Sequence, residues 1–182
     1  DTWAATGAGA FTLSENGLYT VEAWKIFLSR LTPKGVLTVS RWYDASVADE
    51  TGRLISLATA ALMEMGITEP RRHVFLAAQG IVATLIMSKS PFSESDIETL
   101  ERAATEYRHE ILISPRRVPG SDTLARIITS LDRKSLEAYT SSLAFDLTPP
   151  TDDRPFFFNQ LRLSRPFQAL AYVQTALARG PQ

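Results

Sequence analysis

The chain of 182 residues contains no cysteine. Without a thiol it forms no disulfide bond, no thiolate metal site and no cysteine nucleophile. It has only two histidines, His73 and His109, which lie too far apart in sequence for a helical histidine pair on a metal ion. We therefore predict no metal site, and we expect both histidines to be structural or surface residues.

The chain also has almost no net charge and no long apolar run. Its 19 basic and 20 acidic residues give a net charge of -1, so nothing in the overall charge favours nucleic acid as a partner. The longest apolar stretches, 80–88 and 166–178, are too short or too polar for the roughly 20 residues of a membrane helix. We expect a soluble, cytoplasmic domain without a nucleic-acid partner.

A glycine-rich cofactor loop is missing as well. Gly7-Ala8-Gly9 has Thr12 where such a loop needs a third glycine or alanine, and no strand precedes it. We interpret this segment as a flexible loop. Because the chain starts at Asp1 with neither an initiator methionine nor a leader, we expect it to be cut from a longer protein and incomplete as an enzyme.

Helical and strand patterns follow one another along the chain. Helical periodicity or helix signals occur over 18–31, 49–65, 93–107, 124–131, 136–139 and 166–179, and strand patterns over 36–42, 73–78, 81–88 and 110–114. Gly66 is placed to cap the second helix. Ser93 with Asp96 resembles a capping box, which opens a helix that would carry Ile97, Leu100, Ala104 and Tyr107 inward. Helix-to-strand order suggests a parallel sheet, whereas the short gap between 73–78 and 81–88 permits only an antiparallel hairpin.

These elements predict an α/β fold in one domain over 1–182. Residues 1–120 would form the sheet and its helices, and 121–182 a helical extension with a loop. A parallel sheet that finishes in an antiparallel hairpin is the closing half of a methyltransferase-type (Rossmann-like) doubly wound fold. Because the opening half is missing, strand 36–42 would keep an unpaired edge, and we expect a homodimer through that edge.

The first 43 residues, DTWAATGAGAFTLSENGLYTVEAWKIFLSRLTPKGVLTVSRWY, resemble spermidine synthases (polyamine aminopropyltransferases) from the catalytic aspartate that ends their fourth strand. Asp1, Leu13, Tyr19 and the Pro33-Lys34-Gly35 turn fall in the order of that family. The later stretches PFSESDIETL and TDDRPFFF are similar to a bacterial spermidine-synthase-like group whose soluble domain is joined to membrane helices.

The resemblance implies a transferase that uses S-adenosylmethionine or its decarboxylated form on a small-molecule amine or another nucleophile. It also implies a membrane-attached parent protein in which Asp1 is catalytic. The cofactor loop of the family would lie upstream of Asp1, so we expect no cofactor on this piece alone. The second acid of the family, three residues after the first, is replaced by Ala4. That change leaves open a non-catalytic module that keeps the fold for binding or for contact with the membrane part.

Four residues are candidates for a substrate or cofactor cleft. Glu15 and Tyr19 lie just before and in the first turn of helix 18–31, where they either cap the helix or contact a substrate. Arg41 and Trp42 end strand 36–42 at the same edge of the sheet. There a fixed cation and a stacking surface either bind an adenine or a carboxylate, or pack as an ordinary rim.

The adjacent Asp152, Asp153 and Arg154 suggest paired carboxylates at first sight. Neighbouring residues of an extended segment, however, point to opposite sides. We therefore predict a structural loop lock, in which one aspartate accepts backbone amides or pairs with Arg154 and the phenylalanines 156–158 anchor the segment.

Overall fold

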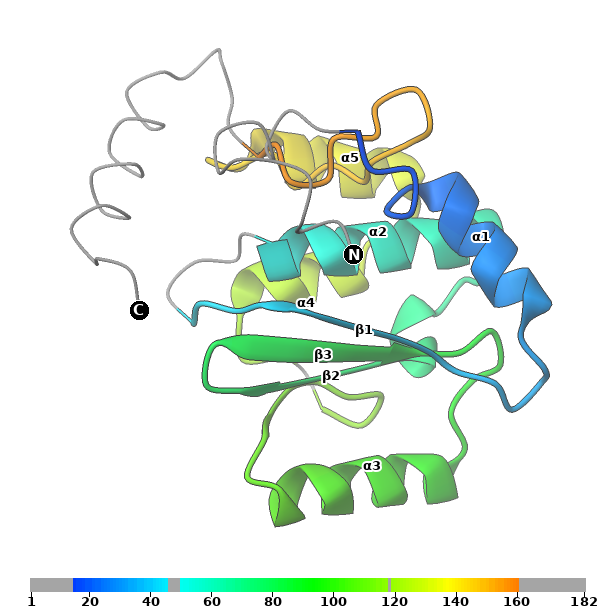
Figure 1. Cartoon of the computed structure of the whole chain (residues 1–182), viewed down its shortest axis with the longest axis vertical. Coiled ribbons are helices and arrows are strands. Elements are labelled where there is room, and N and C mark those ends of the chain that lie inside the picture. The colour runs from blue at the N-terminus through cyan, green and yellow to red at the C-terminus, as the bar shows by residue number, and fades with distance from the viewer. Residues whose placement is uncertain (1–14, 46–49, 118, 161–182) are drawn as a thin grey trace.

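The computed structural model describes residues 15–45, 50–117 and 119–160. Within them lie five α-helices, four strands and a 3-10 turn (Figure 1). In chain order these are α1 (Val21–Arg30), β1 (Leu37–Trp42), α2 (Glu50–Glu64), η2 (Pro70–His73), β2 (Val74–Gln79), β3 (Val82–Met87), α3 (Glu94–Glu106), β4 (Glu110–Ile113), α4 (Asp122–Ile128) and α5 (Arg133–Ser142). The helix predicted over 166–179 lies outside the described residues.

The four strands form one sheet in the order β1-β3-β2-β4, and every neighbouring pair is antiparallel. The predicted hairpin is confirmed as β2 and β3, joined through Gly80, whose φ of 57° is left-handed. The parallel sheet that the helix-to-strand order suggested is wrong for the described strands, because β3 inserts between β1 and β2. These two strands run in the same direction, yet each bonds to β3 and not to the other.

Local signals set the helix ends. The capping box of α3 is confirmed, since the Ser93 hydroxyl accepts from the Asp96 amide and the Asp96 carboxylate accepts from the Ser93 amide. Gly66 follows α2 with a left-handed φ of 83°, as predicted. The prediction that Tyr107 points inward is wrong, because α3 ends at Glu106 and Tyr107 is 62% exposed.

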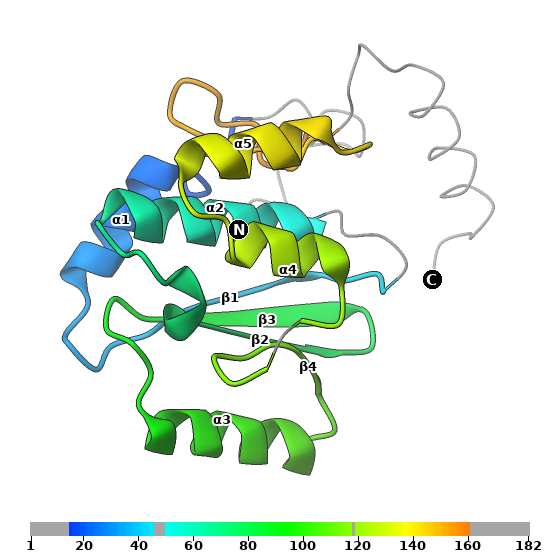
Figure 2. The same ribbon diagram turned by 180° about the vertical axis from the view of Figure 1, so that it is seen from behind.

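Helices cover both faces of the sheet. Helices α1, α2 and α4 pack on one face, and α5 packs on the outer side of α2 and α4 (Figures 1 and 2). The fully buried side chains of this main core include Trp24, Leu28, Leu54, Leu57, Leu62, Leu76, Leu85, Met87, Ile127 and Leu136. Helix α3 covers the other face with a smaller cluster around Phe75, Ala77 and Ala104. Residues from α4 and α5 therefore share one core with the sheet.

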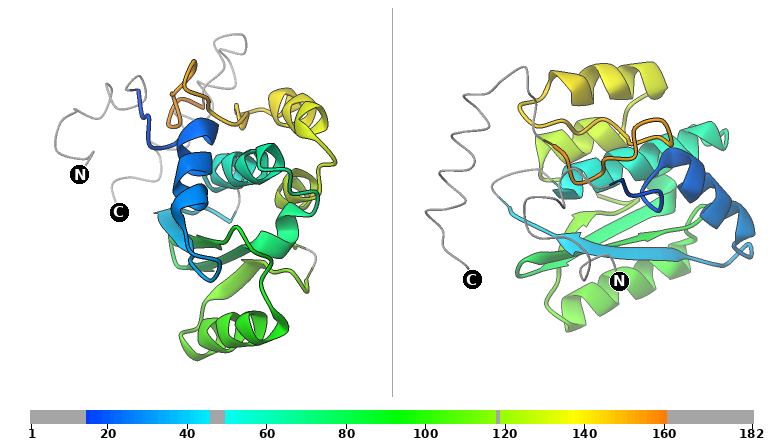
Figure 3. Two further views of the ribbon diagram at one scale, coloured as in Figure 1. Left: turned by 90° about the vertical axis from the view of Figure 1, so that its right-hand side faces the viewer. Right: turned by 45° about the horizontal axis from the view of Figure 1, so that its top comes forward.

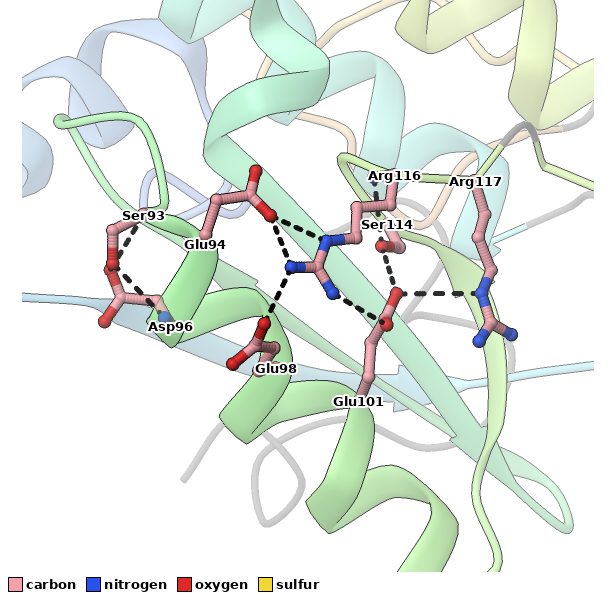
Figure 4. A network of polar contacts seen from close by, with 8 residues as sticks. All are labelled: Ser93, Glu94, Asp96, Glu98, Glu101, Ser114, Arg116 and Arg117. Carbon is pink, nitrogen blue, oxygen red and sulfur yellow. Dashed lines mark hydrogen bonds and ion pairs between the residues drawn. The ribbon is translucent and has the colours of Figure 1, made fainter.

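An ion-pair network ties α3 to the segment after β4 (Figure 4). Arg116 pairs with Glu94, Glu98 and Glu101, which lie on one side of α3 at helical spacing. The Ser114 hydroxyl adds a hydrogen bond of 2.9 Å to Glu101.

Within the residues that the structure describes, no helix has the length and apolar character needed to cross a bilayer.

Candidate functional site

The candidate site lies at the edge of the sheet where β1 and β2 end. These two strands run in the same direction and therefore finish at the same edge. Here the loop 146–160 lies beside the segment 15–20 that leads into α1 (Figure 3, orange and blue). The Asn16 amide donates to the Pro155 carbonyl at 2.7 Å, and the Val21 amide donates to the Pro150 carbonyl at 3.0 Å. Residues far apart in sequence thus meet in this region.

The centre of this region is a cation among aromatic rings, which we call the Arg41 cluster: Tyr19, Arg41, Glu50, Phe157 and Phe158. The Arg41 guanidinium carbon lies 5.2 Å from the Tyr19 ring centroid, 5.9 Å from that of Phe157 and 4.6 Å from that of Phe158. Arg41 Nε donates to the Glu50 carboxylate at 2.5 Å. Only 12% of the Arg41 side chain and 16% of the Glu50 side chain are exposed, so solvent screens the pair weakly.

The three rings also contact one another. Ring centroids are 4.6 Å apart for Tyr19 and Phe157, 5.9 Å for Tyr19 and Phe158, and 5.1 Å for the edge-on pair Phe157 and Phe158. These separations are typical of favourable aromatic pairs. Rings and a carboxylate around one point form an environment that stabilises an organic cation. In this structure the cation is the Arg41 guanidinium of the chain itself.

The start of α1 positions Tyr19. The helix cap is Thr20, whose hydroxyl accepts from the Ala23 amide at 3.2 Å, so Glu15 and Tyr19 do not cap the helix as one reading of the sequence had it. Tyr19 precedes the cap and contacts Trp24, with ring centroids 6.4 Å apart, in the manner of a hydrophobic staple. Trp24 is fixed in turn, because its indole N–H donates to the Leu18 carbonyl at 3.0 Å.

The structure brings together two of the four predicted cleft residues. Tyr19 and Arg41 meet in the Arg41 cluster, whereas Trp42 lies on the opposite face of the sheet, because successive strand residues alternate between faces. Trp42 is 47% exposed and lines a shallow hollow of about 280 Å³ with Ser40 and Val82. Glu15 is exposed.

The polar contacts of the loop 146–160 differ from the predicted ones, whereas its aromatic anchor lies within the predicted phenylalanines 156–158. Asp152, Asp153 and Arg154 lie exposed in a turn, and neither aspartate forms an ion pair with Arg154 in the described part of the chain. The contact at this turn is the Asp152 amide, which donates to the Glu22 carboxylate at 3.1 Å. The aromatic anchor is Phe157, which is fully buried.

The main clamp on this loop is Arg53 of α2, which sequence reasoning missed. Its side chain is almost fully buried, and it donates to the Thr148 carbonyl at 3.2 Å and to the Asn159 carbonyl at 2.5 Å. A signal for it was present, since Arg53 lies on the same helical stripe as the buried Leu57 and Ala61. A cation on an apolar stripe is rarely buried without polar partners.

A second feature at this edge is a cavity of about 360 Å³ between the end of β1, the start of β4 and the start of α4. We call it the acidic pocket; Tyr43, Asp44 and Glu110 are among its lining residues. Burial raises the pKa of the Tyr43 phenol, and the charges of Glu110 and Asp44 raise it further. The sequence offered no signal for this pocket, because its two acids belong to distant segments that only the fold brings together.

The described residues contain no group of three or more histidine, cysteine, aspartate or glutamate side chains that could hold a metal ion. Asp1, the catalytic residue implied by the resemblance, lies outside the residues that the structure describes.

In comparisons with known proteins, no family model, no curated protein and no solved structure matches this chain.

Proposed function

We propose that this chain is part of a transferase domain related to spermidine synthases, with a methyltransferase-type fold. The observation that carries the proposal is the sheet order: β1 and β2 run in the same direction and are linked through α2, while β3 inserts antiparallel between them. This is the arrangement expected where a doubly wound sheet finishes in an antiparallel hairpin.

The chemistry of the sheet edge supports an amine as the nucleophile. An amine substrate is protonated near neutral pH, and the carboxylates of Asp44 and Glu110 in the acidic pocket give a cation a favourable place to bind. A carboxylate in such a position orients the amine and accepts a proton from it. Enclosure between β1, β4 and α4 keeps the bound group partly away from water.

The described residues fit an S-adenosylmethionine-type cofactor only in part. Such a group needs an aromatic or apolar surface for adenine, acceptors for the ribose hydroxyls and room for the sulfonium. Tyr19, Phe157 and Phe158 offer rings, but the Arg41 guanidinium lies close to all three. These residues alone therefore do not form a complete site for the cofactor.

Calorimetric titration of the full-length protein, rather than of this piece alone, with S-adenosylmethionine, with its decarboxylated form and with putrescine tests the proposal. We expect saturable binding of one of the two cofactor forms, and tighter binding of putrescine in the presence of that form. Adenosine serves as the control for binding through the base alone. If neither cofactor form binds, the transferase proposal fails, and the non-catalytic module becomes the better account of the fold.

A further inference from the structure

A groove separate from the Arg41 cluster lies between α5 and the loop 146–160. Its volume is about 500 Å³, which is within the range of small-molecule sites. One wall is a single stripe of α5 that carries Lys134, Glu137 and Ser141 at helical spacing. The loop forms the opposite wall with Thr148, Pro150 and Arg154 among its residues.

Cationic side chains outnumber acidic ones in the lining of the groove, in a chain whose net charge is only -1. Arg53, Lys134 and Arg154 all line it, and Glu137 is its single acid. The Glu137 carboxylate is already engaged by Arg133 at 2.6 Å. In the described residues neither Lys134 nor Arg154 forms an ion pair, so both exposed cations remain available to an anion.

The walls of the groove are fixed before any ligand arrives. Arg53 is only 4% exposed, and its bonds to the carbonyls of Thr148 and Asn159 hold the guanidinium in place. The Val21 amide bonds to the Pro150 carbonyl and holds the loop wall against α1. Because Arg53 and the loop backbone are ordered in advance, binding an anion has to order only the exposed side chains of Lys134 and Arg154.

We propose that this groove binds a phosphate group. Guanidinium and ammonium groups donate charge-assisted hydrogen bonds to phosphate oxygens, and the Thr151 hydroxyl at the same groove adds a neutral donor. The phosphate belongs either to a small soluble ester or to the headgroup of an anionic lipid. This inference does not depend on the transferase proposal, because it involves neither the Arg41 cluster nor the acidic pocket.

Two double variants of the protein test the site. Lys134→Gln with Arg154→Gln removes two cations of the groove, while Arg30→Gln with Lys34→Gln removes two exposed cations beside the turn between α1 and β1. Both variants change the net charge equally, and all four side chains are exposed, so we expect native folds by circular dichroism. We expect the groove variant to bind glycerol 3-phosphate about tenfold more weakly in calorimetry, and the control variant to bind like the wild type.

Vesicles distinguish the two sources of phosphate. If the source is a lipid, wild-type protein sediments with phosphatidylglycerol vesicles but not with phosphatidylcholine vesicles, and the groove variant alone loses this binding. If the source is a soluble ester, only glycerol 3-phosphate binds. The proposal is overturned if the wild type binds neither probe, or if both double variants lose binding equally, since the attraction would then be nonspecific.

Discussion

Several segments of the described chain converge on the side chain of Arg41. Tyr19 from the segment before α1, Glu50 from α2 and the two rings of Phe157 and Phe158 all contact its guanidinium. The contacts combine one ion pair with three aromatic faces in a poorly hydrated position. Arg41 therefore links the loop 146–160 to α2 and to the segment before α1, and it lies at the centre of the candidate site.

Arg41→Met tests this role. We expect it to lower the free energy of unfolding by about 2 kcal/mol, because it removes the charge-assisted hydrogen bond to Glu50 and takes the cation away from the rings. Lys25→Met, which breaks the more exposed Lys25–Glu64 pair, is the matched control and should cost less than about 1 kcal/mol. Urea denaturation measures both, and equal losses would contradict a special role for Arg41.

His73 predicts a dependence of stability on pH. Burial lowers the pKa of its imidazole, although the bond between Nδ1 and the Ser88 carbonyl opposes this shift. The unfolded chain then binds the proton more readily than the folded chain. Stability should be full above the unfolded pKa of about 6.5 and decrease as the pH falls through the lower folded value.

Denaturation of the wild type and of His73→Asn at pH 7.5 and pH 5 measures this effect. The asparagine amide keeps a donor for the Ser88 carbonyl but does not titrate, so we expect the variant to lose less stability on acidification. If the variant loses as much stability as the wild type between pH 7.5 and pH 5, groups other than His73 cause the acid sensitivity.

At the scale of the elements, the end of α3 contains a residue in an unfavourable backbone conformation. Arg108 has a φ of 56°, in the left-handed region that glycine adopts more easily. This conformation lets the His109 amide donate to the Ala104 carbonyl at 2.7 Å and closes the helix end. A residue other than glycine thus adopts a backbone conformation that is typical of glycine.

Arg108→Gly should therefore stabilise the protein. We expect a gain of about 0.5 kcal/mol, since relief of the left-handed strain exceeds the added entropy of the unfolded chain. Arg102→Gly, an exposed position inside α3, is the control and should cost about 1 kcal/mol. Thermal unfolding measures both changes, and a loss of stability in both variants would refute the expectation.

Most elements could be predicted from the sequence to within a few residues. The patterns of α1, α2, α3, β2 and β3 were clear because one face of each is buried and because turns or caps mark their ends. The 3-10 turn Pro70–His73 was not predicted, since four residues carry no periodic signal. Tyr107 was misplaced because the helical period was extended past the actual end of α3.

At the scale of the whole molecule, β1 is an edge strand of the described sheet, and on its outer side no strand from the described ranges pairs with it. Its six residues contain neither lysine nor proline, the residues that commonly block such edges. We expect the edge to recruit a second copy of the chain and to give a dimer at high concentration.

Light scattering over a range of concentrations tests this dimer. Thr38→Lys places a charge on the outer strand and should shift the protein towards the monomer, whereas Thr105→Lys on the exposed surface of α3 should leave the dimer intact. A monomeric wild type at every concentration would rule the edge out as an interface.

The sequence by itself determined where helices and strands form and how several of them end, because periodicity and caps depend on residues within a few positions of one another. It also indicated that Tyr19 and Arg41 lie near one edge of the sheet. Only the tertiary structure decided that β3 separates β1 from β2, that Trp42 faces away from Arg41, and that Glu50 and Phe157 complete the cluster. These features depend on which distant segments pack together, and packing is set by the whole core rather than by any local pattern.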